Sequence, residues 1–268
     1  MIGLAEWLRR RAVRGPDSPA LTCDETTWTY RQLQDQVELL SSVLASCGVG
    51  EGDRVAYLGF NDPMFLVALF ATARIGAIFV PLNFRLTGAE LQFVIDDAGV
   101  HTLLAGEEHR NIIDTIKPSL CCERYFAVDG AADGWESVVE PMATAVPQPA
   151  ADVDAASVAA IVYTSGTTDH PKGAMLTHAN FWANNVNTHL VFDVVSTDVV
   201  LNNAPLFHVG GTLRGDAAGT CRRRPRHPSA GVRSSRHDGG IRETPCHRRF
   251  RGAGNAPVHE PARSIRAG

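Results

Sequence analysis

The chain has 268 residues, of which 44% are hydrophobic, so it is long and apolar enough to build a sizeable globular core. The net charge of −4 divides unevenly: residues 1–211 carry 12 Lys and Arg against 25 Asp and Glu, whereas residues 212–268 carry 13 Arg against 4 acids. Six scattered cysteines and the lack of a signal-peptide pattern favour a reducing, cytoplasmic setting.

The front of the chain alternates between helical and strand patterns. Apolar residues at helical spacing in 2–11 predict a surface helix, and those from Leu33 to Leu44 predict an amphipathic helix that ends before Gly48. Strands are predicted at 54–59, 76–81, 101–105 and 125–128, with helices at 64–73 and from Thr87 to Ile95 between them. This alternation predicts an α/β fold with parallel sheets and flanking helices.

The most apolar stretch, 64–82, does not fit a membrane span. Arg74 and Gly76 interrupt it, and a spanning helix needs about 20 predominantly apolar residues. We therefore predict no transmembrane segment, which leaves peripheral contact with a membrane open. Residues 140–156 contain three prolines and predict a loop.

A polar loop follows the next predicted strand, 158–163, and precedes a predicted helix at 177–187. The loop offers hydroxyls from Thr164, Ser165, Thr167 and Thr168 beside Gly166, and Lys172 adds a positive charge. Such a run also occurs in ordinary turns. It is no Walker A loop, because Lys172 precedes Gly and Ala instead of following Gly and preceding Ser or Thr.

The eleven residues Tyr163-Thr-Ser-Gly-Thr-Thr-Asp-His-Pro-Lys-Gly173 resemble the signature loop of the adenylate-forming superfamily, which contains the acyl-CoA synthetases. Residues 175–180 and 204–211 resemble the motifs that follow this loop, and 28–33, 76–83 and 85–91 resemble the N-terminal part of the same family. The resemblance therefore covers about residues 1–211. It departs at Asp169, where the family usually has Gly. A carboxylate facing a triphosphate would weaken its binding by roughly 1–4 kcal/mol, and one turned to solvent would not.

The resemblance implies an ATP-dependent acid–CoA ligase acting on fatty acids, with ATP, Mg²⁺ and coenzyme A. In such enzymes the acid attacks the α-phosphate of ATP, and the coenzyme A thiol then displaces AMP. Lys172 would be the catalytic residue, Thr168 would also serve the metal ion, and His208 would lie by the acid. We expect His178 to face solvent, outside the site. The residues implied to hold the phosphates are Thr164, Ser165, Gly166, Thr167, Thr168 and Lys172.

Three segments are expected: a first α/β subdomain of the AMP-binding domain (1–150), the start of a second subdomain with the phosphate-binding loop (151–211), and an Arg-rich tail (212–268). Family motifs expected beyond His208, among them Tyr-Gly-x-Thr-Glu, do not occur. We therefore expect this chain to be inactive alone. The alternative is a non-catalytic remnant that binds nucleotide or a partner.

The tail is predicted to be disordered. Arg, Pro, Ala and Gly make up 33 of its 57 residues, a composition typical of a GC-rich gene translated out of frame. Two functional interpretations compete with that hypothesis. Its arginines suit nucleic acid, but aromatic residues for base stacking are missing, so no nucleic-acid partner is expected. A zinc site is disfavoured because its Cys and His spacing fits no finger. Its candidate ligands are Cys221, His227, His237, Cys246 and His247.

Overall fold

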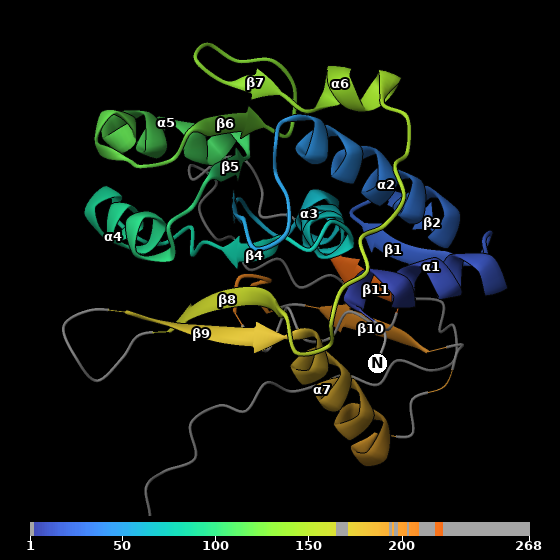
Figure 1. Ribbon diagram of the computed structural model, residues 1–268. Coiled ribbons are helices and arrows are strands. Elements are labelled where there is room, and N and C mark those ends of the chain that lie inside the picture. The colour runs from blue at the N-terminus through green and yellow to red at the C-terminus, as the bar shows by residue number, and fades with distance from the viewer. Residues whose placement is uncertain are drawn as a thin grey trace, which may run out of the picture.

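The chain folds around two β-sheets (Figure 1). The computed structural model describes residues 3–164, 171–192, 195, 198–202, 204–208 and 218–221. The larger sheet has seven strands in the order β7-β6-β5-β3-β4-β8-β9, and only the β8–β9 pair is antiparallel. Its strands are β3 (Arg54–Leu58), β4 (Ile78–Pro81), β5 (Thr102–Ala105), β6 (Arg124–Ala127), β7 (Glu136–Ser137), β8 (Val158–Thr164) and β9 (Lys172–Thr177). The predicted α/β fold with a mostly parallel sheet is confirmed.

Helices cover both faces of this sheet. In Figure 1, α4 and α5 lie to the left of the strands and α1, α2 and α3 to the right. No described helix is both long enough and apolar enough to cross a membrane. The helices are α1 (Leu4–Arg14), α2 (Tyr30–Ser46), α3 (Pro63–Arg74), α4 (Gly88–Ala98), α5 (Glu107–Ile116), α6 (Val139–Thr144) and α7 (His178–Val191), with a 3₁₀ turn η1 (Lys117–Ser119).

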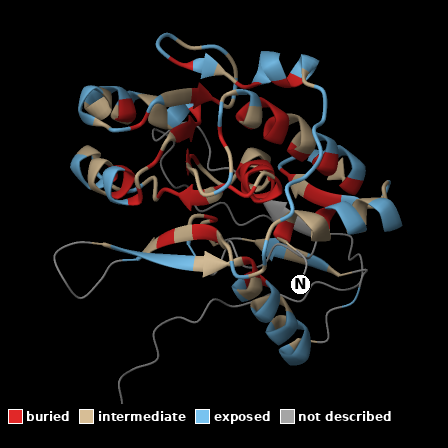
Figure 2. Cartoon of the chain, in the orientation of Figure 1, coloured by how far each residue is buried: buried red, intermediate tan, exposed pale blue. Residues whose placement is uncertain are grey.

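Alternation along the central strands explains why both faces are covered. Successive strand residues point to opposite faces. In β3, Val55 and Tyr57 belong to the core under α2 and α3, whereas Ala56 and Leu58 belong to the core under α4 and α5. Because both sets are buried, the strand sequence is apolar throughout, as expected for a parallel sheet (Figure 2).

Helices α2, α3 and α4 begin where their sequences offer caps. Thr29 and Thr87 form capping boxes with Gln32 and Glu90 at the starts of α2 and α4. Asp62 accepts a hydrogen bond from the Met64 N–H at the start of α3, with proline at the first position. These caps end each strand-to-helix loop within a few residues.

The smaller sheet was not predicted. It contains β1 (Pro19–Cys23) and β2 (Thr26–Thr29), which form a hairpin, and β10 (Val199–Asn202) and β11 (Ala218–Cys221). The predicted disorder of the tail is wrong for β11, which pairs in parallel with both β1 and β10. A strand between two others is held by backbone hydrogen bonds, so it needs few large apolar residues. The other predicted tail features, including the remaining zinc candidates, lie outside the described residues.

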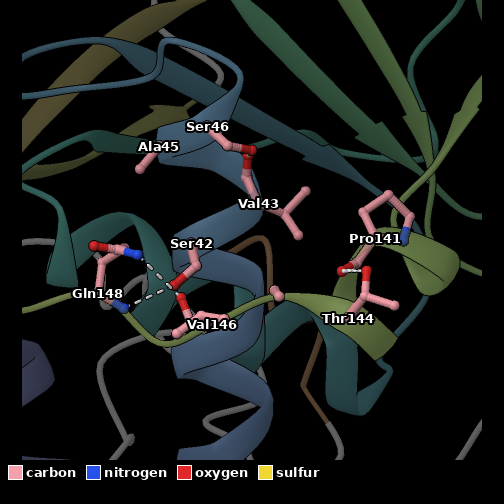
Figure 3. Close-up of a pocket in the computed structure, with 9 residues that line it drawn as sticks. Ser42, Val43, Ala45, Ser46, Pro141, Thr144, Val146 and Gln148 are labelled. Carbon is pink, nitrogen blue, oxygen red and sulfur yellow. Dashed lines mark hydrogen bonds between the residues drawn. The ribbon is translucent and has the colours of Figure 1, made fainter.

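The segment before β8 is fastened to the helices by polar contacts. The Arg74 guanidinium donates to the Gln148 carbonyl at 2.7 Å. The Gln148 N–H donates to Ser42 Oγ at 3.1 Å (Figure 3). This segment, α2 and α6 border a cavity of about 550 Å³. Residues 140–156 were predicted to form a loop, but their first residues belong to helix α6. The predicted subdomain boundary at residue 150 lies just before β8, and β8 joins the same sheet as the strands before the boundary. The division into subdomains stays a prediction.

His178 is buried, contrary to the expectation that it faces solvent. Only 1% of the residue is exposed, and its Nδ1 accepts a hydrogen bond from the Leu4 N–H at 3.1 Å. Gly3, at the N-cap of α1, has no side chain to cap the helix, so the imidazole of α7 supplies that acceptor. Helical position alone could not reveal this contact, because the partner lies 174 residues away.

Replacing His178 tests this capping role. Burial lowers the pKa of His178, so the unfolded chain binds a proton more readily than the folded chain just below the ordinary histidine pKa. The melting temperature should therefore fall as the pH drops through that window. His178→Ala should lower the free energy of unfolding by about 1–3 kcal/mol at pH 8, because the Leu4 N–H loses its hydrogen-bond acceptor. His178→Asn can keep an acceptor and should cost less.

The readout is thermal unfolding of the three chains at pH 8 and pH 6. Both variants should show a smaller pH dependence than the unaltered chain, since neither carries the titrating group. Equal stability of His178→Ala and the unaltered chain at pH 8 would contradict the capping role.

Candidate active site

The hairpin β8–β9 holds the two ends of the polar loop side by side. Thr164, the last residue of β8, pairs with Lys172, the first residue of β9, and both are exposed. The sequence predicted a helix from 177 but not the strand before it. Lys172 is thus placed by backbone pairing with β8. The predicted phosphate-holding residues Ser165, Gly166, Thr167 and Thr168, and the variant position Asp169, lie outside the described residues.

Close packing beneath the loop fixes this hairpin. Gly173 pairs with Tyr163, and a Cβ on Gly173 would lie 2.8 Å from Ile161 Cγ2 and 3.0 Å from Tyr163 Cζ. The Tyr163 hydroxyl donates to Asp97 Oδ2 of α4 at 2.6 Å. Burial and this carboxylate raise the pKa of Tyr163, so it remains a neutral donor. The glycine admits the aromatic ring, and the ring ties β8 to the neighbouring helix.

Topology brings the polar loop and the His208 segment to one edge of the sheet. Strands β3, β4 and β8 run parallel, so their carboxyl ends share an edge, where loops of α/β proteins commonly bind ligands. Thr164 ends β8. Asn61 follows β3, and its side chain is hydrogen-bonded to residues 204–206. The structure thus brings three of the predicted site residues, Thr164, Lys172 and His208, to this edge.

His208 stands at the exposed end of an anchored turn. The His208 N–H donates to the Pro205 carbonyl at 3.2 Å. Leu206 is 5% exposed and belongs to the core, and the Phe207 ring packs edge-on against Phe84 with 5.2 Å between ring centres. The turn therefore presents the imidazole of His208 outward while the two residues before it are held by apolar contacts.

An aromatic cluster at the same edge was missed from the sequence. Phe84 stacks on the His109 imidazole at 5.6 Å, and Phe60 meets both rings edge-on, at 4.9 Å from Phe84 and 4.7 Å from His109. Burial lowers the pKa of His109. These residues lie just beyond the carboxyl ends of β4, β3 and β5, so the rule that ligands bind there would have singled them out.

The described ends of the polar loop carry groups that can bind an anion. Lys172 offers a cation and Thr164 a hydroxyl at the two ends of a loop rich in Ser, Thr and Gly, which are phosphate-binding groups. Among the described residues, no three His, Cys, Asp or Glu side chains gather in a way that could hold a metal.

Comparison with known proteins identifies relatives over most of the chain. Residues 8–217 match the profile of a family described as AMP-binding enzyme. An indoleacetate–CoA ligase of Aromatoleum aromaticum is 38% identical over 211 residues, which are 78% of this chain and 41% of the relative. A feruloyl-CoA synthase of Amycolatopsis is 40% identical over 207 residues, 77% of this chain and 40% of the relative. The chain thus spans about two fifths of the length of these relatives.

Solved structures give the same result. A putative long-chain-fatty-acid CoA ligase from Rhodopseudomonas palustris superposes with a TM-score of 0.74 at 29% identity, covering 82% of this chain and 57% of that one. The N-terminal domain of a Mycobacterium tuberculosis protein, FACL13, superposes with a TM-score of 0.73 at 27% identity, covering 83% and 57%. The fold that carries the candidate site is therefore shared with CoA ligases.

Gly173→Ala should loosen the hairpin that carries Lys172. The new methyl group would clash with Ile161 and Tyr163, and overpacking of this kind costs about 1–3 kcal/mol. Thermal unfolding should show the loss. Adding Ile161→Ala to this variant removes the nearest clashing atom and should recover part of the lost stability. The neighbouring Ala174→Ser is a control at an exposed position. An unchanged melting temperature in Gly173→Ala would contradict the close packing.

Proposed function

The chain belongs to the AMP-binding enzyme family, and we propose that it provides the phosphate-holding part of an ATP-dependent acid–CoA ligase. The observation that carries this proposal is the pairing of Thr164 with Lys172 beneath the polar loop, on the sheet edge that also carries His208. A cation and hydroxyls at one point and an imidazole at another are the groups needed to bind a triphosphate beside a carboxylic acid.

The proposed reaction has two steps. An oxygen of the acid attacks the α-phosphorus of ATP and pyrophosphate leaves, and the thiol sulfur of coenzyme A then attacks the acyl carbon and AMP leaves. Lys172 would neutralise the charge that builds on the β- and γ-phosphates during the first step. Mg²⁺ would enter bound to ATP and share that task, with Thr168 as its predicted ligand. The phosphate-holding roles of Thr164, Ser165, Gly166, Thr167 and Thr168 also remain predictions.

The acid we propose has an apolar body. Fatty acids remain the substrate predicted from the sequence, and the name of a 32% identical long-chain-fatty-acid–CoA ligase of Mycobacterium tuberculosis supports them. The names of the relatives at 38–40% identity point to aromatic acids instead, since they specify indoleacetate and ferulate. Phe60, Phe84 and Phe207 supply aromatic surface near His208, which suits either class. Peripheral membrane contact and a cytoplasmic location also remain proposals.

Lys172→Ala tests the phosphate-holding role. Removing the cation should weaken binding of ATP by about 10–100-fold, because a charge-assisted hydrogen bond is worth about 1.5–3 kcal/mol. Calorimetric titration of the full chain with Mg·ATP measures this. Arg14→Ala, which removes one exposed positive charge from the end of α1, is the matched control and should leave the affinity unchanged.

ATP–pyrophosphate exchange with decanoate, indoleacetate and ferulate then separates the two interpretations of the chain. Exchange that Lys172→Ala abolishes would support a working adenylation site and identify the class of acid. ATP binding without exchange would support the binding-only alternative. Failure to bind ATP would contradict the proposed function.

A further inference from the structure

We propose that Asn61 is a positioning residue for the acid-binding half of the site: its amide holds the turn that ends in His208. This inference rests on the proposed function, since it takes the carboxylic acid to bind beside His208. Asn61 lies outside the resemblance motifs, and its sequence suggested only the start of a helix.

Both functional groups of the Asn61 amide bond to the same short segment. Its Nδ2 donates to the Ala204 carbonyl at 2.8 Å, and its Oδ1 accepts from the Leu206 N–H at 2.8 Å. The side chain thus binds the backbone of residues 204–206 as an adjacent strand would. These contacts join parts of the chain that are 143 and 145 residues apart.

The support on which Asn61 stands is rigid. It lies three residues after the end of β3, whose residues Val55–Leu58 are buried, and immediately before Asp62, which caps α3. On the other side, Leu206 is anchored in the core and Phe207 against Phe84. The amide therefore transmits the position of β3 and α3 to the turn that carries His208.

The phosphate-holding hairpin has a separate support. Tyr163 bonds to Asp97 of α4, and Gly173 packs against Tyr163 and Ile161. The Asn61 side chain instead forms hydrogen bonds with residues 204–206. A change at Asn61 should therefore disturb binding of the acid and leave the affinity for ATP nearly as it was.

Asn61→Asp is the sharpest variant, because it keeps the shape and the acceptor but replaces the donor with a carboxylate that repels the Ala204 carbonyl. Asn83→Asp is the matched control. It makes the same change after β4 on the same sheet edge, but Asn83 Oδ1 only accepts from the Arg85 N–H at 2.9 Å, which a carboxylate can also do. Asn61→Asp loses the bond to the Ala204 carbonyl, whereas Asn83→Asp keeps its bond, and both variants make the same change of charge.

The experiment is calorimetric titration of the full chain with Mg·ATP and with two stable acyl-adenylate mimics, decanoyl- and feruloyl-sulfamoyl adenosine. At pH 8, Asn61→Asp should weaken binding of the tighter mimic about tenfold or more and change the affinity for ATP less than about twofold. Asn83→Asp should change neither. Between pH 8 and pH 5 the mimic affinity of Asn61→Asp should rise relative to the unaltered chain, because a protonated carboxyl can donate to the Ala204 carbonyl as the amide does.

The possible failures are distinguishable. If the unaltered chain binds neither ATP nor a mimic, the proposed function is wrong and this inference falls with it. If the unaltered chain binds a mimic and Asn61→Asp binds it equally well, or loses the mimic and ATP alike, only the positioning role is wrong. Thermal unfolding checks that each variant folds. Should Asn61→Asp not fold, Asn61→Ser, which is uncharged and shorter, must show the same selective loss of mimic binding.

Discussion

Burial of both faces of the central parallel strands is the constraint on which the rest of this structure depends. Neighbouring residues of β3 face different cores, one under α2 and α3 and the other under α4 and α5. Helices α3, α4 and α5 connect β3, β4, β5 and β6 in turn, so these strands run parallel and helices cover both faces of the sheet. All carboxyl ends of β3, β4, β5 and β8 then meet at one edge, and the polar segments of the chain gather there.

The candidate site uses this edge in two different ways. The polar loop proposed to hold phosphates connects the two strands of an antiparallel hairpin, so its two ends are paired across the β8–β9 ladder. The His208 turn instead follows β10 of the smaller sheet and reaches the edge through side-chain contacts with Asn61 and Phe84. Backbone pairing fixes the first part, whereas side-chain contacts of Asn61, Leu206 and Phe207 fix the second.

Features of local origin were the ones that the sequence predicted. Strands β3, β4, β5, β6 and β8 and the starts of α3, α4 and α7 were all placed within about two residues, because periodicity and caps depend on neighbours in the chain. The errors come from long-range contacts. His178 contacts α1 through the Leu4 N–H, and β11 pairs with β1 from the start of the chain as well as with β10. Lys172 and His208 were predicted as site residues through their motifs, and these roles stay predictions. Nothing in the sequence pointed to Asn61, since its partners lie more than 140 residues further on.

The separate supports also bear on how a two-step ligase could work. Each step places a different reactant against the same acyl group, first ATP and then coenzyme A, so the acid side of the site must hold still while the phosphate side empties. A hydrogen-bonded amide contributes only about 1 kcal/mol per bond, far less than the sheet beneath it. Asn61 makes two such bonds to the His208 turn, which Leu206 and Phe207 also anchor. The turn can therefore keep its place if the β8–β9 hairpin, which is tied to α4 through Tyr163 and Asp97, shifts. In the proposed ligase, separate supports for the two parts of the site would let pyrophosphate leave while the acyl group keeps its place.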